Sequence, residues 1–308
     1  MARSGVETGG GPSFAWTTPC KGKSVARRTI AQEIGCEGVA LHAGSVVRMV
    51  LAPGAAGSGI VFRRSDLGER IIKASYDAVA ETRLGTVIAD GAGASVGVIE
   101  HLMAAVAGAE IDDLAVTLDG PEPPILDGDA LGYLELFDRA GFRETGGERR
   151  ALHIRKRVSS GRDDAWAALE PADGRSFVFD IEFPSLAIGK QHLAWAFTRD
   201  AFRTDIAPAR TFGFVPELDA LNTMGLAKGA SLENTLAIDG DRVVNAPLMR
   251  FADEFVRHKV LDAIGDLALA GAPIMGRFIG WRSGHALNNA LLRTLFAEPS
   301  NYEWLPAN

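Results

Sequence analysis

The stretch from Arg250 to Leu267 constrains the chain most, because it has the pattern of one amphipathic helix of about five turns. On a wheel of about 3.6 residues per turn, one broad arc holds only apolar side chains. These are Val256, Val260, Leu261, Ile264, Leu267 and Ala268. Gly271 and then Pro273 follow, which is typical of a helix end.

Three polar residues lie on the opposite side of this helix. His258, Asp262 and Asp266 are spaced at i, i+4 and i+8. A neutral imidazole and a carboxylate one turn apart can point at the same atom, which is how a helix offers two ligands to a divalent metal. The further acid can orient a histidine or a ligand. A solvated helix face has the same spacing, and the helix alone favours that interpretation. A third ligand, a base and an acid must come from elsewhere.

Composition bounds the class of protein. The chain has 308 residues, a length typical of two domains, with 47% hydrophobic and 23% charged residues. Its formal net charge is -7 and it has no long Lys/Arg run, so we expect no nucleic-acid partner. Two cysteines, Cys20 and Cys36, do not make a disulfide framework and indicate a reducing compartment.

No stretch approaches the ~18 consecutive apolar residues of a membrane span. The Gly-, Ser- and Thr-rich N-terminus lacks the apolar core of a signal peptide, and we interpret residues 1–26 as a flexible extension. The expected location is cytoplasmic, although a lipid-bearing substrate would bring the protein to a membrane surface.

The pattern of elements favours an α+β fold with sheets packed on helices. Expected strands are 46–51, 59–64, 112–118, 152–158, 166–170, 177–183 and 274–281. Expected helices are 98–108, 130–140, 250–267 and one opening at 284. A composition shift at 144–150 marks the expected boundary, which gives a first domain at 27–147 and a second at 148–308.

Three other segments carry candidate chemistry. Glu100 and His101 adjoin near a helix start, so the imidazole could bind a metal while the carboxylate takes a proton from water. His285 opens a helix and could act as an acid, provided that a carboxylate such as Asp266 keeps it protonated. Thr211 could face a developing oxyanion. Each residue also has a purely structural interpretation: a buried pair, a capping histidine, and a core strand with alternating phenylalanines.

Together these pieces predict a metal hydrolase site. His101, His258 and Asp262 would supply three ligands and leave a fourth position for water. Two histidines and one carboxylate suit catalytic zinc, and iron(II) uses the same set.

The chain resembles the UDP-3-O-acyl-N-acetylglucosamine deacetylases, the zinc enzymes of lipid A synthesis in Gram-negative bacteria. The resemblance covers about residues 27 to 300. It rests on the number of matching motifs and on their order along the chain, because no single motif is specific enough. They are GVALHAG at 38–44, IEHLMAA at 99–105, PEPPILDG at 121–128, ARTFGF at 209–214, DEFVRHK at 253–259 with Leu261-Asp262 and Gly265-Asp266, and GHALN at 284–288.

The resemblance implies two similar domains, each a β-sheet packed on two α-helices, with the active site between them. It implies one Zn²⁺ on His101, His258 and Asp262, with Glu100 as general base. It implies that His285, supported by Asp266, protonates the leaving amine and that Thr211 stabilises the tetrahedral intermediate. Lys259 and Phe212 would contact the sugar and phosphate region of the UDP-linked acylated amino sugar, and Phe214 the nucleotide. The second domain would hold the acyl chain, and we expect a monomer.

Three positions depart from the family pattern. Ser185-Leu186 stands where a His-Pro pair is usual, Gly97-Val98 where Ser-Thr is common, and Ala40 where Gly is usual. None is an expected ligand or proton-transfer residue. Two alternatives therefore stay open: a zinc amidohydrolase for another N-acyl sugar, and a non-catalytic binding protein on the same fold. The sequence leaves acyl-chain length and the metal loaded in the cell undecided.

Overall fold

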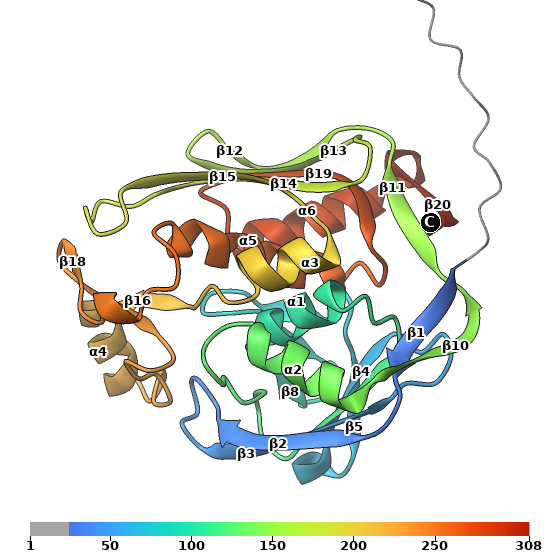
Figure 1. The fold of residues 1–308 in the computed structure, drawn as a ribbon, viewed down its shortest axis with the longest axis horizontal. Coiled ribbons are helices and arrows are strands. Elements are labelled where there is room, and N and C mark those ends of the chain that lie inside the picture. Colours follow the sequence, from blue (N-terminus) through green and yellow to red (C-terminus); the bar gives the residue numbers. More distant parts are fainter. Residues whose placement is uncertain (1–24, 308) are drawn as a thin grey trace, which may run out of the picture.

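Two sheets enclose the helices of the protein. A computed structural model describes residues 25–307. Figure 1 shows a five-stranded sheet at the bottom, a seven-stranded sheet at the top, and the main helices between them. This arrangement confirms the predicted α+β class. None of the described helices is long and apolar enough to cross a membrane.

The first half of the chain builds the five-stranded sheet, in the order β2-β3-β9-β4-β5. Alternation along β3 shows why one face is buried: Val47, Met49 and Leu51 point inward, while Val46 and Arg48 are exposed. The strands are β2 (Ile34–Val39), β3 (Val46–Pro53), β4 (Ile60–Arg64), β5 (Arg70–Lys73) and β9 (Leu114–Leu118). The helices of this half are α1 (Glu100–Gly108) and α2 (Leu131–Ala140).

The second half builds the seven-stranded sheet, in which β12-β13-β19-β11-β20 form one path and β14 pairs with both β19 and β15. Its strands are β11 (Arg150–Ile154), β12 (Val158–Arg162), β13 (Ala165–Glu170), β14 (Arg175–Glu182), β15 (Lys190–Ala196), β19 (Ile274–Trp281) and β20 (Tyr302–Pro306). Its helices are α3 (Arg199–Ala201), which continues into a π-helical turn (Phe202–Ile206), α5 (Glu254–Ala268) and α6 (His285–Ala297).

Smaller sheets complete the fold. Two strands, β1 (Ala26–Ile30) and β10 (Phe142–Glu148), pair with each other. A three-stranded sheet consists of β6 (Val79–Glu81), β7 (Val87–Ala89) and β8 (Ser95–Val96). Another consists of β16 (Phe212–Phe214), β17 (Leu236–Asp239) and β18 (Arg242–Val243), with α4 (Val215–Thr223) between β16 and β17. Short 3₁₀ turns lie at Ser65–Leu67, Ala246–Leu248 and Pro299–Asn301.

Helices α1 and α5 approach each other closely at the centre of the molecule. Gly265 makes this approach possible, because a Cβ there would lie 2.0 Å from the carbonyl oxygen of Glu100. That distance is far inside van der Waals contact, so any side chain at position 265 would separate the helices. The crossing brings the start of α1 against the middle of α5, where the candidate ligands lie.

Two predicted elements differ most from the structure in their bounds. The helix begins at Glu254 instead of Arg250, because the Glu254 carboxylate accepts the backbone N–H groups of Arg250 and Phe251 at 2.5 and 3.3 Å. These bonds hold residues 250–253 in a turn outside the helix. The strand predicted at 152–158 is two strands, β11 and β12, because the exposed run 155–157 turns the chain between them.

Some predictions fall wholly or partly outside the described residues. The flexible extension at 1–26 lies outside them except for its last two residues, and Ala26 already belongs to β1. Cys20 also lies outside them, while Cys36 is a free, half-buried thiol. Residues 144–148 belong to β10, and β11 begins at Arg150. The domain boundary at 147 stays a prediction.

Candidate metal centre and catalytic cavity

Three buried side chains from α1 and α5 converge on one point. His101 is the second residue of α1, and His258 and Asp262 lie one turn apart on α5. One donor atom from each lies within 4.8 Å of the other two. The Oδ1 atom of Asp262 is 3.4 Å from Nε2 of His258 and 3.8 Å from Nε2 of His101. The two-histidine, one-carboxylate set expected from the sequence is therefore assembled.

Both imidazoles are held in the neutral form that binds a metal. Burial, and then the neighbouring His258, lower the pKa of His101 to about 3. Burial also lowers the pKa of His258. Nδ1 of His258 lies 3.1 Å from the carbonyl oxygen of Ala209, which as an acceptor requires the proton on Nδ1 and leaves Nε2 free.

The two oxygens of the Asp262 carboxylate differ in their surroundings. Its Oδ2 accepts a hydrogen bond from Nζ of Lys259 at 2.6 Å. Its Oδ1 is buried and has no hydrogen-bond partner among the described residues. Burial acts to raise the pKa of Asp262, but His258 and Lys259 outweigh it and the pKa is lowered. An ionised, unpaired oxygen beside two neutral imidazoles fits a divalent cation well.

Glu100 is buried at the first position of α1, next to His101 in the sequence. Its Oε2 accepts the backbone N–H of Thr86 at 2.9 Å. Gly85 has a φ of +134°, and a Cβ there would lie 2.9 Å from Oε1, so a glycine is needed beside the carboxylate. Burial raises the pKa of Glu100 to about 7, which suits a base that exchanges protons near neutral pH.

His285, at the start of α6, pairs with Asp266 on α5. Nδ1 of His285 lies 2.9 Å from Oδ2 of Asp266. Burial acts to lower the pKa of His285, but the charge and hydrogen bond of Asp266 raise it to about 9. The imidazole is therefore held protonated at neutral pH, as a general acid requires.

These groups share one open cavity. It encloses about 1670 Å³ of empty space, counted out to its mouth. Of the ten site residues predicted from the sequence, Asp266 alone does not line it, because it lies buried behind His285. The predicted residues on the wall are Glu100, His101, Thr211, Phe212, Phe214, His258, Lys259, Asp262 and His285. Their placement agrees with the prediction, and their separate roles stay predictions.

Thr211 can offer only its hydroxyl to a ligand. Its backbone N–H donates to the carbonyl of Gly128 at 2.8 Å, and its own carbonyl accepts from Leu236 at 2.9 Å. Phe212 also packs edge-on against Phe255, with ring centroids 5.0 Å apart, so it is a core residue as well as a wall residue. The structural interpretation of this segment therefore holds, and the catalytic role of Thr211 stays a prediction.

Sequence reasoning missed two buried residues that organise the acid. Oγ1 of Thr86 donates to Oδ1 of Asp266 at 2.5 Å, and Nδ2 of Asn288 donates to Oδ2 at 2.8 Å. Thr86 thereby bridges the base and the acid, because its N–H is bonded to Glu100. Asn288 had a signal, since it closes the GHALN motif one helical turn after His285. Thr86 stands in no motif.

His42 also lies nearer the chemistry than expected. It belongs to a turn, as predicted, but its ring lines the cavity and its Nε2 lies 2.9 Å from the carbonyl of Leu84. Glu122 accepts the backbone N–H groups of His42 and Ala43 at 2.8 and 3.1 Å. The motifs at 38–44 and 121–128 are thus hydrogen-bonded to each other at the edge of the cavity.

Comparison with known proteins identifies the family. The family model of LpxC, the UDP-3-O-acyl N-acetylglycosamine deacetylases, matches residues 27–297. The chain belongs to this family. It is 48% identical over 264 residues to the UDP-3-O-acyl-N-acetylglucosamine deacetylase of Phenylobacterium zucineum, covering 85% of this chain and 90% of the relative. It is 44% identical over 284 residues to the one of Acidithiobacillus ferrooxidans, covering 91% and 93%. The corresponding protein of Myxococcus xanthus is 43% identical over 285 residues, covering 92% and 90%.

Proposed function

We propose that the protein is a zinc-dependent deacetylase. Its substrate would be UDP-3-O-(3-hydroxyacyl)-N-acetylglucosamine, and its products acetate and UDP-3-O-acyl-glucosamine, in the committed step of lipid A synthesis. The observation that carries the proposal is the unpaired oxygen of Asp262 beside two neutral imidazoles, with a base and an acid on the same cavity wall. Membership of the deacetylase family supports the choice of substrate.

The chain's own groups divide the proton transfers. When bound by His101, His258 and Asp262, a zinc ion lowers the pKa of its water toward ~7 and polarises a carbonyl. Glu100, with its pKa near 7, takes the proton from the attacking water. His285 gives its proton to the departing sugar amine, and Asp266 holds the imidazole in place for that step. The hydroxyl of Thr211 donates to the developing oxyanion.

The rest of the cavity provides for a large amphipathic substrate. Lys259 and Arg83 are cations on its wall that can approach a phosphate or a sugar oxygen. Apolar side chains continue the wall toward α4, where an acyl chain can pack. They are Phe183, Leu218, Leu221 and Leu287. Ser185 and Leu186 lie outside this wall and are bonded to residues 240 and 241, so their departure from the family pattern does not alter the cavity directly.

Acetate release from the acylated UDP-sugar, measured with chelator and with zinc added back, tests the proposal. We expect release that disappears with chelator and returns with zinc. Release from unacylated UDP-N-acetylglucosamine at an equal rate would favour an amidohydrolase for another N-acyl sugar. No release from a folded, zinc-loaded sample would refute the catalytic proposal. Adding back iron(II) in place of zinc distinguishes the two metals that this donor set accepts.

A further inference from the structure

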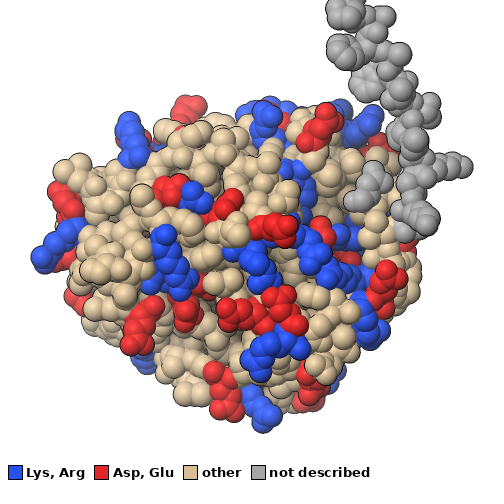
Figure 2. All heavy atoms as spheres, viewed as in Figure 1, with Lys and Arg blue, Asp and Glu red and all other residues tan. Residues whose placement is uncertain are grey.

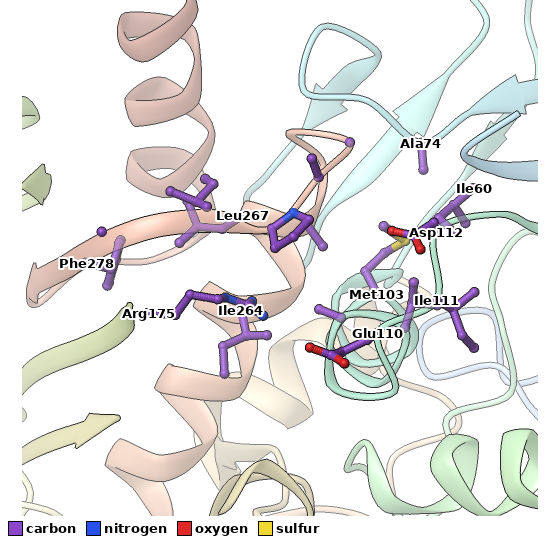
Figure 3. Close-up of a pocket in the computed structure, with 18 of the residues that line it drawn as sticks. Ile60, Ala74, Met103, Glu110, Ile111, Asp112, Arg175, Ile264, Leu267 and Phe278 are labelled. Carbon is purple, nitrogen blue, oxygen red and sulfur yellow. The ribbon is translucent and has the colours of Figure 1, made fainter. Parts of the chain in front are cut away.

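A second cavity lies beside the same two helices, away from the metal donors. It is a narrow cleft between α1, α5 and the seven-stranded sheet. Figure 3 shows it between the end of α1, with Met103 and Glu110, and the C-terminal part of α5, with Ile264 and Leu267. None of its lining residues is one of the ten predicted site residues. The cleft is therefore separate from the catalytic cavity.

The inner wall of the cleft is apolar and comes from both halves of the chain. Helix α1, helix α5 and the seven-stranded sheet each contribute large hydrophobic side chains. They are Met103, Val106, Ile264, Leu267, Phe177 and Phe278. A narrow space between such walls suits an unbranched hydrocarbon chain better than a polar or a wide ligand.

The rim of the cleft is cationic. Arg149 and Arg175 line both the cleft and a shallower hollow next to it, which Arg199 also borders. Arg28 is close enough to Arg149 and Arg199 that they oppose its charge. Among the described residues, two acids line the cleft or the hollow, Glu110 and Asp112, so two carboxylates face these four arginines. Figure 2 shows Lys and Arg side chains gathered in the region between α1, α3 and β1 on this face.

Arg175 and Arg28 are the two of these arginines without an ion pair among the described residues, and the Arg28 guanidinium donates to the carbonyl of Ala109 at 3.3 Å. Arg149 bonds Asp112 at 3.0 Å and approaches Glu110 at 3.4 Å, and Arg199 lies 4.0 Å from Glu110. Within residues 25–307, the Arg175 guanidinium has no hydrogen bond or ion pair and stacks on the ring of Phe197, 3.7 Å from its centroid. Burial lowers its pKa to about 10 despite the nearby Glu110. A half-buried cation without a counter-ion favours an anionic ligand, and the fork of Arg matches a carboxylate.

We propose that this cleft binds a long-chain fatty carboxylate, with its alkyl chain between α1, α5 and the seven-stranded sheet and its carboxylate on Arg175. The apolar wall and the unpaired cation line one cleft, with Arg175 beside Ile264 in Figure 3, so the cleft offers both an apolar surface and a cation to such a molecule. The proposal does not depend on the deacetylase reaction, because no catalytic residue takes part.

Photo-crosslinking locates the ligand directly. The probe is hexadecanoate carrying a diazirine on its chain, added to the full, zinc-loaded protein and followed by peptide mass spectrometry. We expect label on the segments around Met103, Ile264 and Phe278. Label around Leu221 and Leu287 would report the catalytic cavity and serves as an internal reference. Label confined to that cavity would overturn the proposal and leave the cleft as a packing void.

Two variants and one control separate recognition from chance contact. Arg175→Gln removes the cation, and Ala107→Leu fills the cleft from α1. Arg175→Gln should lower cleft labelling about tenfold, which corresponds to one charge-assisted contact, and Ala107→Leu should lower it by occupying the space of the alkyl chain, while the reference labelling is unchanged in both. Arg63→Gln, an exposed arginine on β4, should have no effect. A methyl ester of the probe should label the cleft as weakly as Arg175→Gln does. Cleft labelling that is equal in the parent protein, in Arg175→Gln and with the methyl ester would refute the assignment to Arg175. Melting temperatures equal to that of the parent protein show that the variants are folded.

Discussion

Asp262 and Asp266 lie one turn apart on α5 and each pairs with a histidine, but the two histidines differ in protonation. His258 shares Asp262 with His101, and its pKa is lowered by burial. His285 bonds to Asp266, and its pKa is raised to about 9 although burial opposes this. The same two residue types thus form a neutral ligand in one place and a protonated acid in the other.

The difference comes from what else surrounds each ring. The rings of His101 and His258 meet edge to face with centroids 5.0 Å apart, so each disfavours a charge on the other. One carboxylate also serves both, and Lys259 already occupies part of it. His285 has a direct bond to a carboxylate, and the charges of Glu100 and Asp262 add to that of Asp266. Because burial acts to lower the pKa of all three histidines, neighbouring charges account for the difference between the two pairs.

The largest effect is expected from a substitution in the pair that is predicted to bind metal. Asp262→Ala removes the unpaired oxygen and leaves Lys259 without its partner, so zinc is lost and turnover falls by more than about 10⁴-fold. Metal analysis and acetate release on the same sample measure both. Asp241→Ala, at an exposed turn, is the control. A variant that keeps one zinc per chain and normal turnover would show that the three donors do not form the site.

Removing the acid should separate chemistry from metal binding. His285→Ala keeps the three donors, so zinc should stay bound while turnover falls by about 10²- to 10⁴-fold. Zinc content and kcat, measured together, give the comparison with Asp262→Ala. His192→Ala, an exposed histidine that also pairs with an aspartate, should be silent. Turnover at the parent rate would remove His285 from the mechanism.

The dependence of activity on pH tests the predicted protonation states of Glu100 and His285. Glu100 acts deprotonated, so activity rises with pH through its pKa of about 7, and His285 acts protonated, so activity falls through its pKa of about 9. A bound cation lowers both values, so the limbs of the bell lie at or below them. Asp266→Asn removes the largest raising charge and should move the alkaline limb to lower pH. An alkaline limb that stays in place would assign it to another group.

The smallest effect is expected at Thr86, which is bonded to both Glu100 and Asp266. Thr86→Val deletes the bond to Asp266 but keeps the N–H that holds Glu100, so kcat should fall about tenfold with KM nearly unchanged. Thr86→Ser, which restores the hydroxyl, should recover most of the rate. Thr294→Val, whose hydroxyl bonds only its own helix, is the matched control. A change in KM alone would indicate that Thr86 acts on substrate binding.

The sequence predicted the helices that carry the site better than their exact ends. The apolar arc and the i, i+4 spacing placed His258 and Asp262 correctly, because periodicity within one helix is a local property. The start at Arg250 was wrong, because the deciding contact is the Glu254 carboxylate closing a turn. That bond competes with helix formation and leaves no periodic signal.

Contacts between distant segments could not be predicted from spacing. Thr86 and Asp266 are 180 positions apart, and their bond depends on the packing of α5 against α1. The cleft beside Arg175 is built from many segments, and no run of the sequence combines its apolar wall with its arginines. Family resemblance supplied the predicted catalytic residues because these lie in its motifs. The resemblance predicted neither the hydrogen bond between Thr86 and Asp266 nor the cleft beside Arg175.

The crossing of α1 over α5 also sets the order of events during synthesis. His101 leaves the ribosome about 150 residues before His258, a delay on the order of ten to thirty seconds at ordinary elongation rates. His285 lies in α6, and β20, which closes the sheet, is the last strand. A nascent chain therefore cannot assemble the donor set until most of it has been translated. Any metal held by these three donors would therefore be loaded late, after Asp262 has been made, and would stabilise only molecules that contain α5.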